Sequence, residues 1–105
     1  MATVTATSKS AGIVNLSSGS FTSDNTATTV TLGFKPRWVK VVNTTDVIVW
    51  EKIEGMAAAN SIKTVTGGTT TIDTGSAILI NTDGTITISQ TAVGSSKAIS
   101  WVAQG

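Results

Sequence analysis

The sequence predicts an all-β domain, an antiparallel β-sandwich or a partly closed barrel, with at most one short helical turn. Three observations lead to this prediction. Short runs rich in threonine, valine and isoleucine alternate apolar with polar residues. Turn-forming pairs such as Gly67-Gly68 and Asp83-Gly84 separate these runs. Helical periodicity is nearly absent, and only residues 56–60 have the composition of a helical turn.

The expected strands follow from runs of β-branched and aromatic residues bounded by turn signals. Pro36 is expected just before a strand, because it has no N–H to donate to a ladder. The predicted strands lie near residues 3–7, 12–16, 27–32, 37–43, 46–53, 61–65, 69–72, 77–81, 85–89 and 98–103.

The run 46–53 differs from the others because it is apolar on both faces. Val47, Val49 and Ile53 lie on one face, and Ile48 and Trp50 lie on the other. Such a strand is either central between two packed layers or covers a partner. Trp50 is our best candidate for a protein interface, whereas Trp38 and Trp101 are expected in the core.

Composition excludes several functional classes. The 105 residues are enough for one domain, 1–105, and contain neither cysteine nor histidine. The usual proton-transfer side chain at neutral pH and the commonest metal ligands are therefore missing, so we predict no enzyme, no cofactor and no metal site. Charged residues are 12% of the chain and the net charge is +1, which predicts no binding to nucleic acid or to a membrane.

Asp73-Thr74-Gly75 is the most catalytic-looking string, because aspartic proteases carry Asp-Thr-Gly in a loop after a strand. The retroviral type is a homodimer of about this size. The motif lies far past the middle of this chain, however, and the other elements of those enzymes are missing. A turn between two strands is therefore the preferred interpretation, and a dimeric protease is kept as a third hypothesis. Asn81-Thr82-Asp83-Gly84 is interpreted as a hairpin turn and not as a calcium loop.

The first residues are weak in core-forming side chains. Within residues 1–10 the apolar content is alanine and Val4, apart from Met1, so we expect an arm or an edge strand. Strand addition to a neighbouring subunit would give this segment backbone hydrogen bonds. The candidate interface residues are therefore Ala2, Thr3, Val4, Thr5, Ile48 and Trp50.

The segment from Gly33-Phe34-Lys35-Pro36 to Glu54-Gly55-Met56, with Trp50 between them, resembles a recurrent pattern in virion proteins of tailed bacteriophages. The final run, residues 99–103, is similar to the strand that often closes such proteins. The resemblance implies a small β-sandwich on a virion, either a capsid decoration (cement) protein or a piece of a tail fibre. No functional residue is carried over from it.

Because the sequence begins at Met1 and amounts to one stand-alone domain, we expect a capsid decoration protein that stabilises the capsid lattice. The resemblance then implies the major capsid protein as partner, a homo-oligomer with a trimer favoured, assembly in the host cytoplasm and a final position on the capsid surface. The alternative is a tail-fibre or tail-tip module that binds a glycan or receptor.

Overall fold

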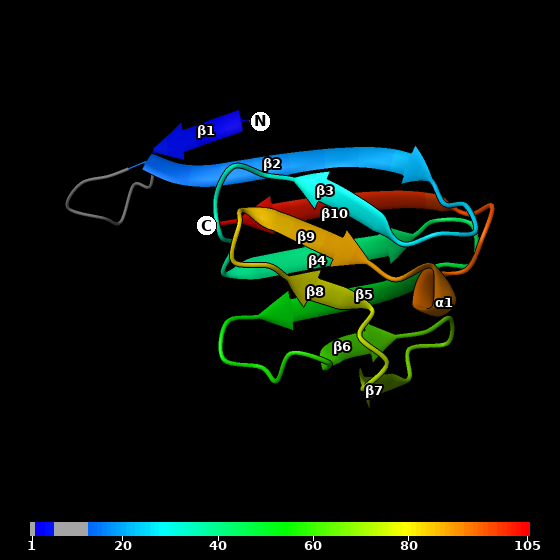
Figure 1. Cartoon of the computed structure of the whole chain (residues 1–105). Coiled ribbons are helices and arrows are strands. Elements are labelled where there is room, and N and C mark those ends of the chain that lie inside the picture. Colours follow the sequence, from blue (N-terminus) through cyan, green and yellow to red (C-terminus); the bar gives the residue numbers. More distant parts are fainter. Residues whose placement is uncertain (1, 6–12) are drawn as a thin grey trace.

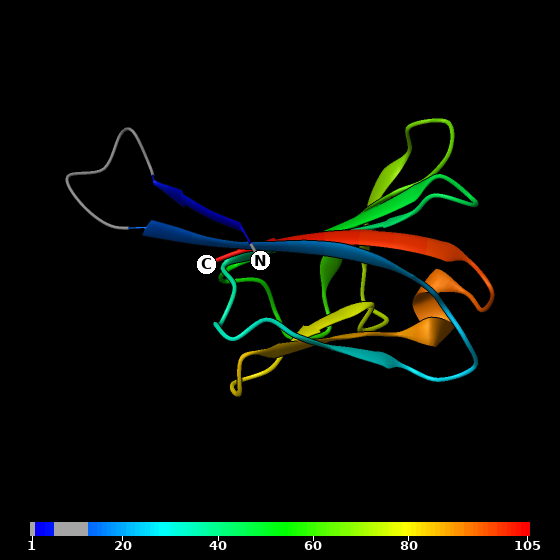
Figure 2. The same ribbon diagram turned by 90° about the horizontal axis from the view of Figure 1, so that it is seen from above.

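The computed structural model describes residues 2–5 and 13–105, and these form two antiparallel sheets packed face to face (Figures 1 and 2). The predicted all-β sandwich is confirmed. The larger sheet has seven strands, in the order β1 (Ala2–Thr5), β2 (Ile13–Thr22), β10 (Ala98–Gln104), β4 (Trp38–Asn43), β5 (Ile48–Ile53), β6 (Ser61–Thr64) and β7 (Thr70–Asp73). The smaller sheet has the order β3 (Thr28–Thr31), β9 (Thr85–Ile88) and β8 (Ile78–Ile80).

The core lies between the two sheets and is built by period-two alternation. Where the two sheets overlap, every second side chain of a strand points into this core. Its largest fully buried apolar side chains are Trp50, Ile78, Ile86, Ile88, Ile99, Val39 and Val41. Gly19 on β2 lies opposite Trp101 on β10, and a Cβ there would be 3.0 Å from the Trp101 ring. Glycine at this position therefore lets the indole lie against β2.

The turns form where the sequence places them. Gly67 and Gly68 both have positive φ in the β6–β7 hairpin, and Gly84 has φ of 82° in the β8–β9 hairpin. The Asp83 carboxylate accepts hydrogen bonds from the Thr85 amide and hydroxyl, at 3.2 and 2.6 Å. These bonds lower the pKa of Asp83. The predicted Asn-Thr-Asp-Gly hairpin turn is thereby confirmed.

The helical turn lies elsewhere than predicted. Residues 56–60 form turns, and the short helix is α1 (Gln90–Val93). Its position depends on a contact between residues 50 apart, because the buried Asn43 amide donates to the Val93 carbonyl at 2.9 Å. Such a contact leaves no local pattern in the sequence.

The N-terminal segment is partly described. Ala2–Thr5 form β1, an edge strand that pairs with the first part of β2. The edge-strand prediction is confirmed for these four residues, and residues 6–10 lie outside the described part of the chain. In Figure 2, β1 and the start of β2 project beyond the region where the two sheets overlap.

Candidate functional site

The Asp-Thr-Gly string serves the fold in this structure. Both carboxylate oxygens of Asp73 accept a hydrogen bond, Oδ2 from Trp50 Nε1 at 3.0 Å and Oδ1 from the Gly75 amide at 2.7 Å. The first bond satisfies the indole of a fully buried tryptophan, and the second closes the bend that leads to β8. This geometry is that of a turn, in agreement with the preferred interpretation of the motif.

Trp50 itself has no exposed surface. It lies on the inner face of β5, opposite Val41 on β4, with the Lys63 ammonium 5.6 Å from its ring centroid. Ile48, on the same face, is half-buried and packs against the core. This placement corrects the prediction that these two side chains form an interface: the doubly apolar strand is central, and Trp50 is on its covered side.

Lys52 is a buried cation that the sequence does not reveal as special. Its side chain shares the inner face of β5 with Trp50 and the residue is 4% exposed. The ammonium donates to the carbonyls of Ala57, Ala58 and Asn60 at 2.8, 3.0 and 2.7 Å. Burial lowers its pKa. The three carbonyls use all three donors of the ammonium, so Lys52 fixes the turns after β5 and has no donor left for a ligand.

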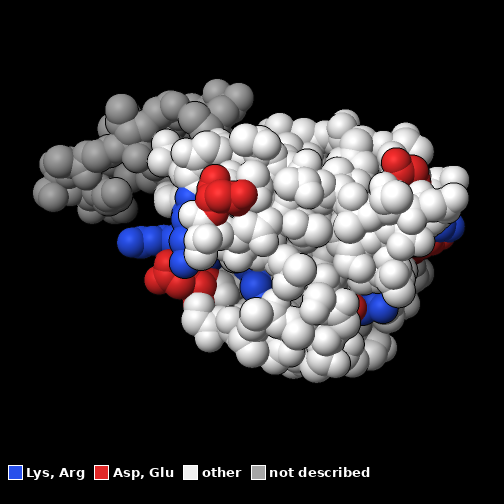
Figure 3. Space-filling view, in the orientation of Figure 1, with Lys and Arg blue, Asp and Glu red and all other residues white. Residues whose placement is uncertain are grey.

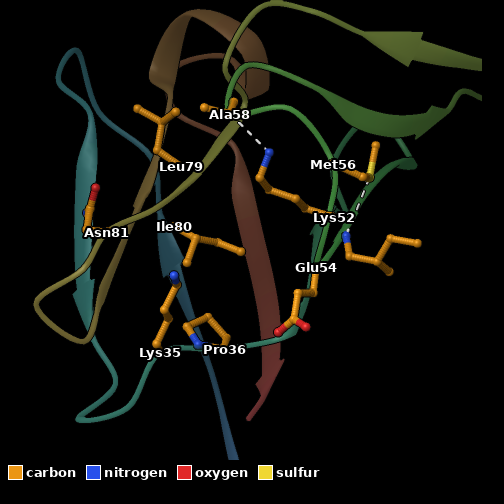
Figure 4. Close-up of a pocket in the computed structure, with 11 residues that line it drawn as sticks. Lys35, Pro36, Lys52, Glu54, Met56, Ala58, Leu79, Ile80 and Asn81 are labelled. Atoms are coloured by element: carbon orange, nitrogen blue, oxygen red, sulfur yellow. Dashed lines mark hydrogen bonds between the residues drawn. The ribbon is translucent and has the colours of Figure 1, made fainter.

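A pocket of about 440 Å³ opens beside Lys52, between β8 and the segments before β4 and after β5 (Figure 4). Figure 4 shows the Lys52 side chain pointing toward Ala58, away from the rim residues Lys35 and Glu54. The buried ammonium is already satisfied, and the other charged lining residues, Lys35 and Glu54, are exposed. Its lining residues are Lys35, Pro36, Lys52, Ile53, Glu54, Gly55, Met56, Ala58, Leu79, Ile80 and Asn81.

The described residues contain neither a metal-binding cluster nor a membrane-spanning helix. No group of three or more His, Cys, Asp or Glu side chains among them is placed to hold a metal ion. Likewise, no helix in the described ranges is long and apolar enough to cross a membrane.

The outer surface of the smaller sheet follows the alternation rule. Its outward positions include Thr29 opposite Thr87 and Thr31 opposite Thr85. Figure 3 views the molecule from this side, and the charged side chains lie mostly toward the margins of the view. A polar outer face is what an antiparallel sheet exposed to water normally shows.

The outer surface of the larger sheet breaks that rule, and this surface is our candidate site. The side chains that point away from the core on β10, β4, β5 and β6 are mostly apolar; they are half-buried, and Ile53 is exposed. Figure 2 shows the smaller sheet and α1 on one side of the larger sheet, and no described element over the other side. We call this surface the outer face; it comprises Trp38, Lys40, Val42, Val49, Glu51, Ile53, Ile62, Thr64, Ser100 and Val102.

Trp38 belongs to this outer face and not to the core, which corrects its expected position. It is half-buried, and its Nε1 donates to Glu51 Oε2 at 3.2 Å. Trp101 packs against the core, as predicted. The sequence carried a signal for the outer face that was missed, because Trp38-Val39 and Val41-Val42 make β4 apolar on both sides, as β5 is.

No protein-family model, no curated protein and no solved structure matches this chain. What the chain does must therefore be inferred from its own surfaces.

Proposed function

We propose that this chain is a structural protein that acts by association, and specifically a capsid decoration protein of a tailed phage that binds the major capsid protein. Its chemistry would be the burial of apolar area and the pairing of strands, and it would catalyse no reaction. The resemblance of residues 33–56 to virion proteins and the all-β fold support this class.

The observation that carries the proposal is the edge strand β1. Ala2–Thr5 pair with β2 along one edge, in the register Ala2 with Leu16 to Thr5 with Ile13. No strand of the described chain pairs with the other edge of β1, which is left with backbone donors and acceptors to offer. An edge strand that projects from the body suits addition to a sheet of a neighbouring subunit. In this proposal Ala2, Thr3, Val4 and Thr5 form the contact with the capsid.

The weak charge of the protein is consistent with such a contact. With seven basic and six acidic residues, long-range steering by net charge is small. Attachment would then depend on backbone pairing and apolar area, and we expect it to change little when salt is raised from low to physiological concentration.

The proposal is tested with purified capsids and the full chain. We expect the protein to co-sediment with capsids, and deletion of residues 2–10 to weaken this binding far more than it lowers the melting temperature. If the deletion weakens capsid binding and lowers the melting temperature to a similar extent, the segment contributes to the stability of the isolated domain and is not a dedicated capsid contact. Binding to isolated tails and not to capsids would instead favour the tail-tip alternative, and acid-optimum peptidase activity abolished by Asp73→Asn would favour the protease hypothesis.

A further inference from the structure

The outer face of the larger sheet has a pattern that repeats about the line between β4 and β5. Strand register places Lys40 opposite Glu51, and Val42 opposite Val49. One strand farther out on each side, Val102 of β10 lies beside Lys40, and Ile62 of β6 lies beside Glu51.

From this pattern we propose that the outer face binds the outer face of a second copy, with a two-fold axis parallel to the strands between β4 and β5. Such an axis exchanges β4 with β5 and leaves positions along the strands unchanged. This inference goes beyond the proposed function, because it concerns the isolated protein and leaves β1 free for the capsid. It replaces the trimer that the resemblance implies with a dimer.

The two-fold arrangement matches most of the outward side chains with a suitable neighbour. Lys40 faces Glu51 of the second copy, and Val42 faces Val49 of the second copy. Farther from the axis the register places apolar opposite apolar and hydroxyl opposite hydroxyl, except at the margin, where Ser18 faces Ile72 of the second copy. The remaining matches, each between the two copies, are Trp38 with Ile53, Val102 with Ile62, Ser100 with Thr64 and Ser20 with Thr70.

Other axes do not give this match. An axis between β5 and β6 places Glu51 on Ile62 and Val49 on Thr64 of the second copy. An axis between β10 and β4 places Val102 on Lys40. An axis across the strands, through the row of Lys40 and Glu51, places each charge on its own counterpart, which is repulsive. Self-complementarity about one line is the requirement for an isologous dimer.

The charges on the outer face are available for pairing between copies. Among the described residues the ion pairs are Arg37 with Glu54, at 3.6 Å, and Lys97 with Asp46, at 3.1 Å. Lys40 and Glu51 are cross-strand neighbours but do not form such a pair. With one cation and one anion at its centre, the outer face is complementary in charge to a second copy related by the two-fold axis. A strongly charged partner would leave one of these two charges facing a like charge.

The face also has a hollow that the second copy can fill. It has a volume of about 320 Å³ and is lined by Lys40, Val42, Ser100, Trp101 and Val102. In the two-fold arrangement the side chains of Ile62 and Thr64 of the second copy stand over it. Two twisted sheets packed in this way cross at about 30°, so the contacts nearest the axis contribute most.

The first test measures the mass of the purified full chain by sedimentation over a range of concentrations. We expect a dimer, and we expect Val49→Asp to raise the dissociation constant at least about tenfold, since it places a carboxylate against Val42 of the other copy. Thr29→Asp, on the exposed outer side of the smaller sheet, is the matched control and should leave the constant unchanged. A protein that stays monomeric, or a mass of three copies, would overturn the inference.

The second test exchanges the charges and does not depend on how well Val49→Asp folds. Lys40→Glu and Glu51→Lys should each weaken the dimer about tenfold, because each places like charges across the axis. A mixture of the two variants should form a heterodimer with the original affinity, and a chain carrying both changes should again form a homodimer. If neither combination restores the affinity, the proposed pairing is wrong. If the parent protein is itself monomeric and still binds capsids, only this inference, and not the proposed function, has failed.

Discussion

The two faces of β4 and β5 carry nearly the same kinds of side chain, but the inner face is buried under the smaller sheet and the outer face is not covered. On the inner face, Trp50 donates to Asp73 and Lys52 is enclosed by three carbonyls. On the outer face, Trp38 donates to Glu51 and Lys40 is half-exposed. The comparison teaches that composition does not decide which face of a strand is buried. The three-stranded sheet decides it, because it covers the inner face alone.

The tryptophans give the largest expected difference between the faces. Trp50→Ala should lower the free energy of unfolding by about 3–5 kcal/mol, since it leaves a cavity in the core and removes the donor to Asp73. Trp38→Ala should lower it by about 1 kcal/mol or less in the monomer, because that indole is already partly exposed to water and no second layer covers it. Urea unfolding in dilute solution measures both. Equal losses would show that the outer face is as well packed as the core.

The next largest expected difference in stability is between variants of Lys52, on the inner face, and Lys40, on the outer face. Lys52→Met should cost about 2 kcal/mol, because the carbonyls of Ala57, Ala58 and Asn60 lose their donor. Lys40→Met should change the monomer by less than about 0.5 kcal/mol. Denaturant titration of both variants checks this. A Lys52→Met protein as stable as the parent would mean that the turns after β5 hold without the ammonium.

Lys52 also predicts a dependence of stability on alkaline pH. Burial lowers its pKa in the folded state below the ordinary value of 10.5, so the unfolded chain binds this proton more tightly. The free energy of unfolding should therefore rise as the pH increases from the lowered pKa to 10.5. With no tyrosine or cysteine in the chain, this rise is measured as the difference between the parent and Lys52→Met. A difference that does not change with pH would contradict the shift.

Local signals made most of the fold predictable from the sequence. Alternation and turn-forming pairs located the strands and hairpins, because both act over a few residues. Local signals did not predict the positions of Trp38 and Trp50, since Trp38 was expected in the core and Trp50 at an interface and the structure has the reverse. Alternation says which side chains share a face, but which face receives a second sheet depends on the path of the whole chain. The enclosure of Lys52 and the position of α1 are hidden for the same reason, since each depends on contacts made only in the folded chain.

The smallest expected difference in stability is between variants of the two carboxylates that accept the tryptophan hydrogen bonds, Asp73 and Glu51. Asp73→Asn keeps one acceptor oxygen where the carboxylate has two, so either the Trp50 indole or the Gly75 amide loses its partner. We expect a loss of about 1 kcal/mol, the usual contribution of one such hydrogen bond. Glu51→Gln can turn its amide oxygen toward the Trp38 indole, which is also partly in water, and should change stability by less than about 0.5 kcal/mol. Thermal unfolding of the two variants, with dimerisation measured in parallel, separates the roles. Asp73→Asn should leave the dimer intact, whereas Glu51→Gln should weaken it by removing the charge opposite Lys40. A variant at Asp73 that weakens the dimer more than the variant at Glu51 would reverse the assignment of the two faces.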